Sequence, residues 1–164
     1  MLLIDGVHRY FYPGDVINGE LYINLVKDFD VRGVRLRLSC EEYVYWTEEE
    51  KVNESNSGNN AQHRQRTRTV TYTHTEDRMK GLGIPGYVKD GIYLVFEGNG
   101  VNKGGPNIRI GRGKRVYPFQ FTIPSGFNLP SSYGWDGVGR INYTLHAYMD
   151  NPMWRDFGTS VGEI

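Results

Sequence analysis

The stretch Val116–Met149, VYPFQFTIPSGFNLPSSYGWDGVGRINYTLHAYM, contains two strand patterns joined by a segment rich in proline, glycine and serine. In each half, apolar and aromatic residues occupy every second position, which places them on one face of a strand. These rows are Tyr117, Phe119, Phe121 and Ile123, and then Ile141, Tyr143, Leu145, Ala147 and Met149. A connection this long predicts that the chain passes between two sheets rather than through a tight hairpin.

The composition of the whole chain favours an all-β fold. The sequence has 164 residues, which is enough for one domain with its own core, and it includes 21 glycines, 7 prolines and 12 tyrosines. No long run places apolar residues at helical spacing, and aromatic residues favour the half-buried surface of a sheet. We therefore expect residues 1–164 to form a single all-β domain with little helix.

The charge balance restricts the kinds of partner. There are 19 basic and 19 acidic side chains, so no long-range field draws the chain to nucleic acid or to an anionic membrane. No apolar N-terminal run has the length of a signal peptide or a membrane span, and the single cysteine, Cys40, cannot form an internal disulfide. These features predict a cytoplasmic protein that neither binds nucleic acid nor inserts into a membrane.

Turn and strand signals alternate near the N-terminus. Residues 12–15, Tyr-Pro-Gly-Asp, predict a turn, because proline presets one backbone dihedral angle and glycine accepts a positive φ. Gly19 precedes an alternating strand and predicts either a bulge or a close approach of another backbone segment. That strand would turn Leu21, Ile23 and Leu25 towards the core.

The segment Val34–Thr47 predicts one long strand whose apolar face includes Leu36 and Trp46. We expect both side chains to lie in the core. Glu42 falls on the same face, where a carboxylate is costly unless it is paired or reaches solvent. A bend or bulge near Cys40–Glu42 would bring it to solvent, and we expect one there.

A polar segment follows this strand. Residues 48–66, EEEKVNESNSGNNAQHRQR, have low complexity and predict a mobile loop. The segment begins with acidic residues and ends with basic ones. The simpler interpretation is therefore a long hairpin whose two arms face each other with complementary charge.

The residues that could perform chemistry form no recognisable site. None of the four histidines has the spacing used by zinc sites or by nucleophilic catalysis. Cys40 has inward parity, which is typical of a core thiol. The basic, glycine-rich residues 98–113 lack the Lys-Ser/Thr ending of a phosphate-binding loop. We therefore expect no enzymatic activity, no metal site and no cofactor.

Five motifs follow one another along the chain: YPGD at 12–15, VRGVRLRL at 31–38, YVYWTE at 43–48, VYPFQFTIP at 116–124 and MDNPMW at 149–154. Their order and spacing resemble the N-terminal domain of the arrestin family, and most closely that of the α-arrestins, or arrestin-domain-containing proteins. The resemblance covers nearly the whole chain. It implies an immunoglobulin-like β-sandwich that acts as a non-enzymatic adaptor, binding membrane-protein cargo for endocytic trafficking and ubiquitination.

The resemblance also gives the polar segment a second interpretation. It places Arg64, Arg66 and Arg68 next to the position where arrestins carry a loop that probes their receptors. These arginines are therefore candidate partner-binding residues for acidic or phosphorylated side chains. The implied partners are the cytosolic tails of membrane proteins, at the plasma membrane or endosomes, and a ubiquitin ligase recruited through a region absent from this sequence.

Two features depart from the family pattern. Met1–Asp15 does not match the paired-lysine strand with which receptor-binding arrestins sense phosphates, and neither a second sandwich nor a Pro-Pro-x-Tyr motif occurs in the sequence. Whether the chain is a fragment stays open. The alternative function is a structural or assembly subunit, similar to the arrestin-fold proteins of retromer or of bacterial sporulation control. Trp46-Thr47-Glu48 favours the adaptor.

Overall fold

The computed structural model describes residues 1–5, 10–54, 64–101, 106–136, 138–151 and 157–161. Strands and their connections make up this part of the chain, and it contains no helix that could cross a membrane. The strands are β1 (Leu2–Ile4), β2 (Val16–Leu25), β3 (Phe29–Val31), β4 (Gly33–Glu54), β5 (Arg64–Asp77), β6 (Tyr87–Val88), β7 (Gly91–Gly98), β8 (Ile108–Ile110), β9 (Gly113–Thr122), β10 (Tyr133–Trp135), β11 (Gly139–Asp150) and β12 (Phe157–Val161). The predicted all-β class is confirmed.

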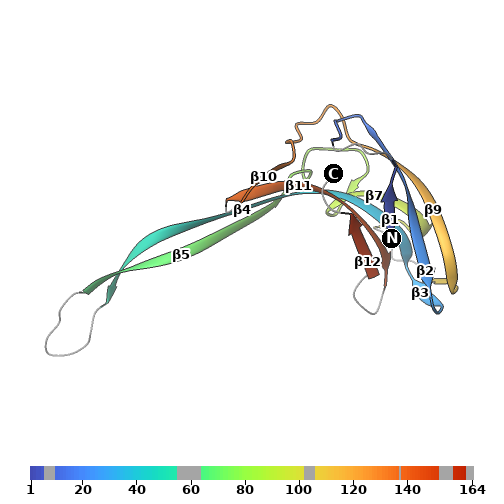
Figure 1. Cartoon of the computed structure of the whole chain (residues 1–164), viewed down its shortest axis with the longest axis horizontal. Helices are drawn as coiled ribbons and strands as arrows, with labels where there is room; N and C mark the ends of the chain where they lie inside the picture. The colour runs from blue at the N-terminus through green and yellow to red at the C-terminus, as the bar shows by residue number, and fades with distance from the viewer. Residues whose placement is uncertain (6–9, 55–63, 102–105, 137, 152–156, 162–164) are drawn as a thin grey trace.

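Two antiparallel sheets form the body of the molecule (Figure 1). The smaller sheet has the order β1-β2-β9, and the larger one has the order β10-β11-β4-β7-β6, with β12 added to β11 and β5 added to β4. Strands β3 and β8 form a separate pair. Because β9 lies in the smaller sheet and β11 in the larger, the connection between them passes from sheet to sheet, as predicted.

The core lies between the apolar faces of the two sheets. Its buried residues form one cluster, to which the larger sheet contributes Val34, Leu36, Leu38, Cys40, Leu145, Ala147 and Met149, and the smaller sheet Leu2, Ile17, Leu21, Leu25, Phe119 and Phe121. Apart from Leu2 and Ile17, these residues belong to the alternating rows predicted from the sequence. Their burial supplies most of the free energy that favours folding, at about 25 cal/mol for each Å² of apolar surface.

The predicted turn at residues 12–15 is present. The amide of Asp15 donates to the carbonyl of Tyr12 at 2.9 Å, and the Asp15 carboxylate accepts a hydrogen bond from the Tyr12 amide at 2.8 Å. Gly14 has φ 94°, a left-handed conformation that favours glycine. The turn therefore forms for the predicted reason, because Gly14 accepts a positive φ.

Gly19 lies where two backbone segments approach closely, which is one of the two arrangements predicted from its sequence position. A Cβ atom there would stand 2.2 Å from the carbonyl oxygen of Leu3 and 2.6 Å from the ring of Phe119. Gly19→Ala should therefore destabilise the protein by about 1–3 kcal/mol, because β1 or the ring must shift. Gly134→Ala is the matched control, since no atom lies within 4 Å of a Cβ built there. Equal urea midpoints for the two variants would contradict this expectation.

The bend predicted near Cys40–Glu42 is wrong. Strand β4 pairs with β11 without a break from Gly33 to Val44, and its register shift against β7 lies between Val34 and Arg35. The Glu42 side chain is 24% exposed, and one of its carboxylate oxygens lies 3.4 Å from Nε of Arg78. This ion pair offsets the cost of placing the Glu42 carboxylate on that face, so the strand needs no bulge.

Candidate functional site

Strands β4 and β5 extend well beyond the sandwich as a two-stranded arm (Figure 1). Beyond Val44, β5 is the only described strand that pairs with β4. This pairing continues to Glu54 and Arg64. We call residues 45–54 and 64–73 the arm. The loop predicted over residues 48–66 is therefore mostly strand, and residues 55–63 lie outside the described part. Strand pairing satisfies backbone groups whatever the polarity of the side chains.

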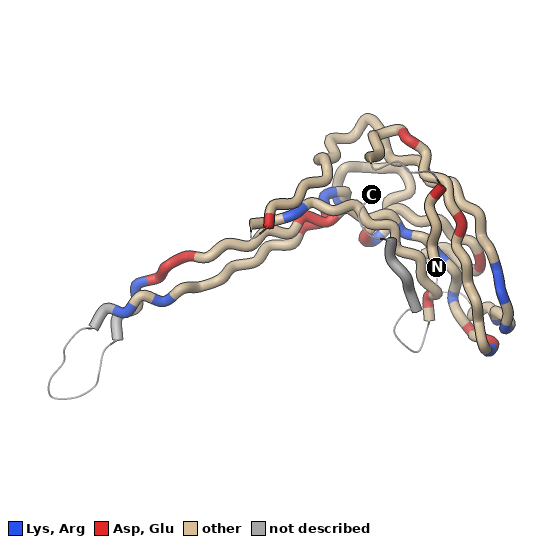
Figure 2. Tube along the Cα trace, in the orientation of Figure 1, with Lys and Arg blue, Asp and Glu red and all other residues tan. Residues whose placement is uncertain are grey.

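The cross-strand register gives the arm two unlike faces. One face carries Trp46, Glu48, Glu50 and Val52 from β4, together with Arg66, Arg68, Val70 and Tyr72 from β5. The opposite face combines Tyr45, Thr47, Glu49 and Lys51 with the threonines at 67, 69, 71 and 73. We call these the aromatic-basic face and the threonine face. Figure 2 shows acidic residues along β4 and basic residues towards the far end of the arm.

The core position predicted for Trp46 is wrong. Its parity matches that of Leu36, but the side chain is 42% exposed, because the smaller sheet does not extend beneath the arm. Trp46 instead stacks on Tyr72, with ring centroids 5.4 Å apart and planes at 18°. The indole Nε1 donates to Glu48 at 3.0 Å, and the Tyr72 hydroxyl donates to Glu50 at 2.8 Å.

Two of the predicted arginines lie on the aromatic-basic face with their side chains described, and both residues are exposed. Arg68 forms an ion pair with Glu50 at 3.3 Å, which agrees with a hairpin of complementary charge. The backbone of Arg64 pairs with Glu54, and its side chain lies outside the described part. The register therefore places Arg66 and Arg68 together, whereas their role in partner binding stays a prediction.

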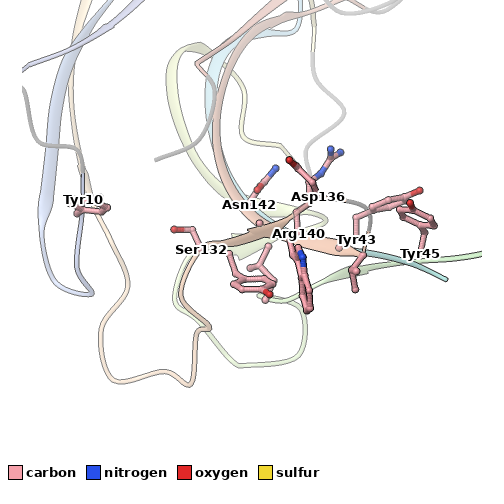
Figure 3. Close-up of a pocket in the computed structure, with 13 residues that line it drawn as sticks. Tyr10, Tyr43, Tyr45, Ser132, Asp136, Arg140 and Asn142 are labelled. Atoms are coloured by element: carbon pink, nitrogen blue, oxygen red, sulfur yellow. The ribbon is translucent and has the colours of Figure 1, made fainter.

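A cleft of about 660 Å³ lies where the arm leaves the sandwich (Figure 3). Tyr43 and Tyr45 come from β4, Arg140 and Asn142 from β11, and further walls come from β10 and its flanking residues. The Arg140 guanidinium lies over the Tyr43 ring, 5.4 Å from its centroid, which is the geometry of a cation–π contact. The sequence pattern does not reveal this cleft, because only the pairing of β11 with β4 brings these segments together.

Strand β10 forms the outer wall of this cleft. It stands at the end of the order of described strands in the larger sheet, and its Tyr133 and Trp135 are 55% and 62% exposed. Exposed aromatic rings supply large contact areas at little cost in side-chain entropy. An edge strand can also accept an added strand through its backbone. The cleft is therefore suited to an extended peptide.

Two titratable groups near the core, the Cys40 thiol and the Tyr143 hydroxyl, have raised pKa values. Burial raises the pKa of the Cys40 thiol to about 11, so that the thiol stays protonated and weakly nucleophilic at neutral pH. Burial also raises the pKa of Tyr143, whose hydroxyl donates to the Pro130 carbonyl at 2.6 Å. In the described part of the chain, no three His, Cys, Asp or Glu side chains are placed to hold a metal ion.

The family to which this chain belongs agrees with this architecture. Residues 1–84 match the family model of the arrestin (or S-antigen) N-terminal domain. Among solved structures, sporulation control protein Spo0M from Bacillus subtilis matches this chain with a TM-score of 0.49 and 14% identity. The match covers all of this chain and 47% of Spo0M, so the chain spans about half the length of that protein. No curated protein sequence matches the chain. The chain belongs to the arrestin family, and its β-sandwich is an arrestin N-terminal domain.

Proposed function

We propose that this arrestin-type interaction module is a non-enzymatic adaptor that binds the cytosolic tails of membrane-protein cargo. The observation that carries the proposal is the arm, which holds Arg66 and Arg68 on one face and away from the sandwich. A projecting ribbon can reach a partner that is too bulky to approach the sandwich itself. The family is built around protein interaction, which supports the same conclusion.

The chemistry of the arm favours an acidic, extended partner. Arginine side chains bind carboxylates and phosphates with two parallel hydrogen bonds, and the pair on β5 alternates with Thr67 so that both project from one face. The outer edges of a two-stranded ribbon also leave backbone groups for a partner strand. A flexible tail could therefore pair with the ribbon through its backbone while its acidic side chains meet the arginines.

The aromatic cleft at the base of the arm offers the same tail a second contact. Tyr43, Tyr45, Tyr133 and Trp135 present rings to it, and Arg140 adds a positive charge. A tail that lies along the arm and ends in this cleft would combine a weak charged contact with burial of apolar surface. In the proposal, recruitment to plasma membrane or endosomes follows from the cargo, and a ubiquitin ligase binds through another region.

The double variant Arg66→Gln/Arg68→Gln should weaken binding of an acidic tail peptide by roughly two- to fivefold per arginine at low salt, because exposed ion pairs are individually weak. The loss should shrink as salt rises, since the Debye length falls from roughly 10 Å at 0.1 M to about 3 Å at 1 M. Titration calorimetry at the two salt concentrations measures both effects.

A matched control is Thr69→Gln/Thr71→Gln on the threonine face of the same strand, which leaves every charge in place. A shortened chain in which residues 49–69 are replaced by Asn-Gly joins Glu48 to Val70, which already pair, and removes all three predicted arginines. All chains should first show the same melting temperature within error. Unchanged affinity in the double arginine variant and in the shortened chain would contradict a role for the arm in binding.

A further inference from the structure

A second cleft, of about 320 Å³, lies on the face of the larger sheet that points away from the core. Alternation along β4 turns Arg35 and Arg37 to this face, because their neighbours Val34, Leu36 and Leu38 point inward. Across the sheet, β11 and β7 supply aromatic side chains, and the turn between β6 and β7 supplies Lys89. Neither the candidate peptide site nor the core uses these residues.

Arg35 is the most enclosed basic residue that lines this cleft, because its side chain is only 4% exposed although it lies on the outer face of the sheet. One terminal nitrogen donates to Asp150, and the other donates to the carbonyl of Asn99 at 3.2 Å. Its Nε is buried and has no hydrogen-bond partner in the described residues. Gly33 lies beside this arrangement, and a Cβ there would stand 2.7 Å from the carbonyl oxygen of Glu97 and 3.3 Å from that Nε.

The charges around the cleft do not cancel. Asp150 accepts hydrogen bonds from both Arg32 and Arg35. On the other side, Asp90 pairs with Arg37 and also accepts from the hydroxyl of Tyr93. Lys89 adds a further cation, so four basic side chains line the cleft with two carboxylates. The lining therefore has an excess of two positive charges at neutral pH, without counting His146.

The backbone of Lys89 has an unusual conformation. Lys89 has φ 56°, and it is the one non-glycine residue in the described chain with a positive φ. This left-handed conformation is uncommon for a long side chain, and glycine or asparagine adopts it more readily. The turn therefore keeps a lysine at the rim of the cleft in a conformation that lysine does not favour. Strained positions of this kind cluster at functional sites.

Aromatic rings form the floor beside the charged groups. His146 stacks on Tyr148 with centroids 5.4 Å apart, and Tyr93 meets Tyr148 edge to face at 6.5 Å. Burial and the hydrogen bond to Asp90 raise the pKa of Tyr93, so that its hydroxyl stays protonated. The cleft thus combines positive charge with flat apolar surfaces that can contact a ring or a carbon chain.

We propose that this cleft binds the phosphate monoester group of a small molecule. A phosphate monoester carries nearly two negative charges at neutral pH, which match the excess charge of the lining, whereas a carboxylate carries one. Arginine and lysine are the side chains that bind phosphate oxygens most strongly. The volume of this cleft, about 320 Å³, is near the lower end of the range for small-ligand sites. It leaves room for the phosphate group and a small organic part next to the aromatic rings.

The test titrates the full chain with glycerol 3-phosphate and with AMP at constant ionic strength. Glycerol, adenosine and sodium sulfate at matched ionic strength are the controls for the organic part and for non-specific anion binding.

Lys89→Asn removes the rim charge and suits the left-handed backbone, so the variant should fold. It should bind either phosphate about tenfold more weakly, the order expected for one charge-assisted hydrogen bond. Lys80→Asn, which changes an exposed lysine outside the cleft, should leave binding unchanged.

A second variant, Arg32→Gln, removes a partly exposed guanidinium but keeps a donor for Asp150, and it should also weaken phosphate binding. Calorimetry with a phosphoserine peptide separates a free ester from a phosphorylated side chain. Binding of both small esters, lost in Lys89→Asn and kept in Lys80→Asn, would support the proposal. Absence of binding, equal binding of sulfate, equal losses in the two lysine variants, or binding of the phosphopeptide without the small esters would overturn it.

Discussion

Replacing Leu36 by alanine should lower the free energy of unfolding by about 2–5 kcal/mol. The side chain lies on β4, is fully buried, and belongs to the cluster formed by both sheets. Truncation removes apolar surface from this cluster and leaves a cavity, and the strands that surround it cannot close in without losing their ladder pairing. Urea unfolding followed by tryptophan fluorescence measures the change.

Trp46→Ala is the matched comparison, because the two residues share one face of one strand. Trp46 is 42% exposed and contacts Tyr72 across the arm, so its loss should cost no more than about 0.5–1.5 kcal/mol, the range for an aromatic pair. The order of the two effects is the decisive result. If Trp46→Ala destabilised the protein as much as Leu36→Ala, the indole would have to be buried in solution.

Asp150→Asn should destabilise the protein by about 3–5 kcal/mol, which is the usual cost of removing one partner from a buried ion pair. The Asp150 side chain is 8% exposed, and it pairs with Arg35, which is 4% exposed, as well as with Arg32. The substitution keeps the shape of the side chain but leaves the Arg35 charge buried without a counter-charge. Thermal unfolding and urea titration of the variant measure this loss.

Two further variants test whether the uncompensated charge is the cause. Asp90→Asn removes the partner of Arg37, but these two side chains are 53% and 27% exposed, so water can replace the carboxylate and the loss should be small. Arg35→Met/Asp150→Asn removes the buried charge as well and should recover part of the stability lost in Asp150→Asn. A double variant less stable than Asp150→Asn would show that packing of Arg35, rather than its charge, determines the effect.

Periodicity in the sequence was sufficient to predict which residues face the core within the sandwich. Phe119, Phe121, Leu145 and Met149 alternate with polar residues, and all four are buried. The crossover after β9 followed from its length and its proline and glycine content. These inferences succeeded because side-chain direction in a strand depends only on local backbone geometry, which alternates with a period of two.

The candidate sites depended on more than local geometry. The family resemblance predicts the three arginines as partner-binding residues from their position after Trp46, and the register of β5 places Arg66 and Arg68 on one face of the arm. The aromatic cleft and the basic cleft were not predicted, because each combines residues from strands far apart in the sequence. A single sequence carries no direct signal for such contacts.

The sequence alone thus determined which side chains share a face of each strand, whereas the tertiary structure decided which of those faces are buried. Leu36 and Trp46 have the same parity, yet only Leu36 is covered, because the smaller sheet ends before the arm begins. Arg35 has the parity of an exposed residue and is nevertheless buried, since Asp150 and the segment at Asn99 enclose it. Alternation selects the face of a strand, and only the packing of other segments against that face determines whether water reaches it.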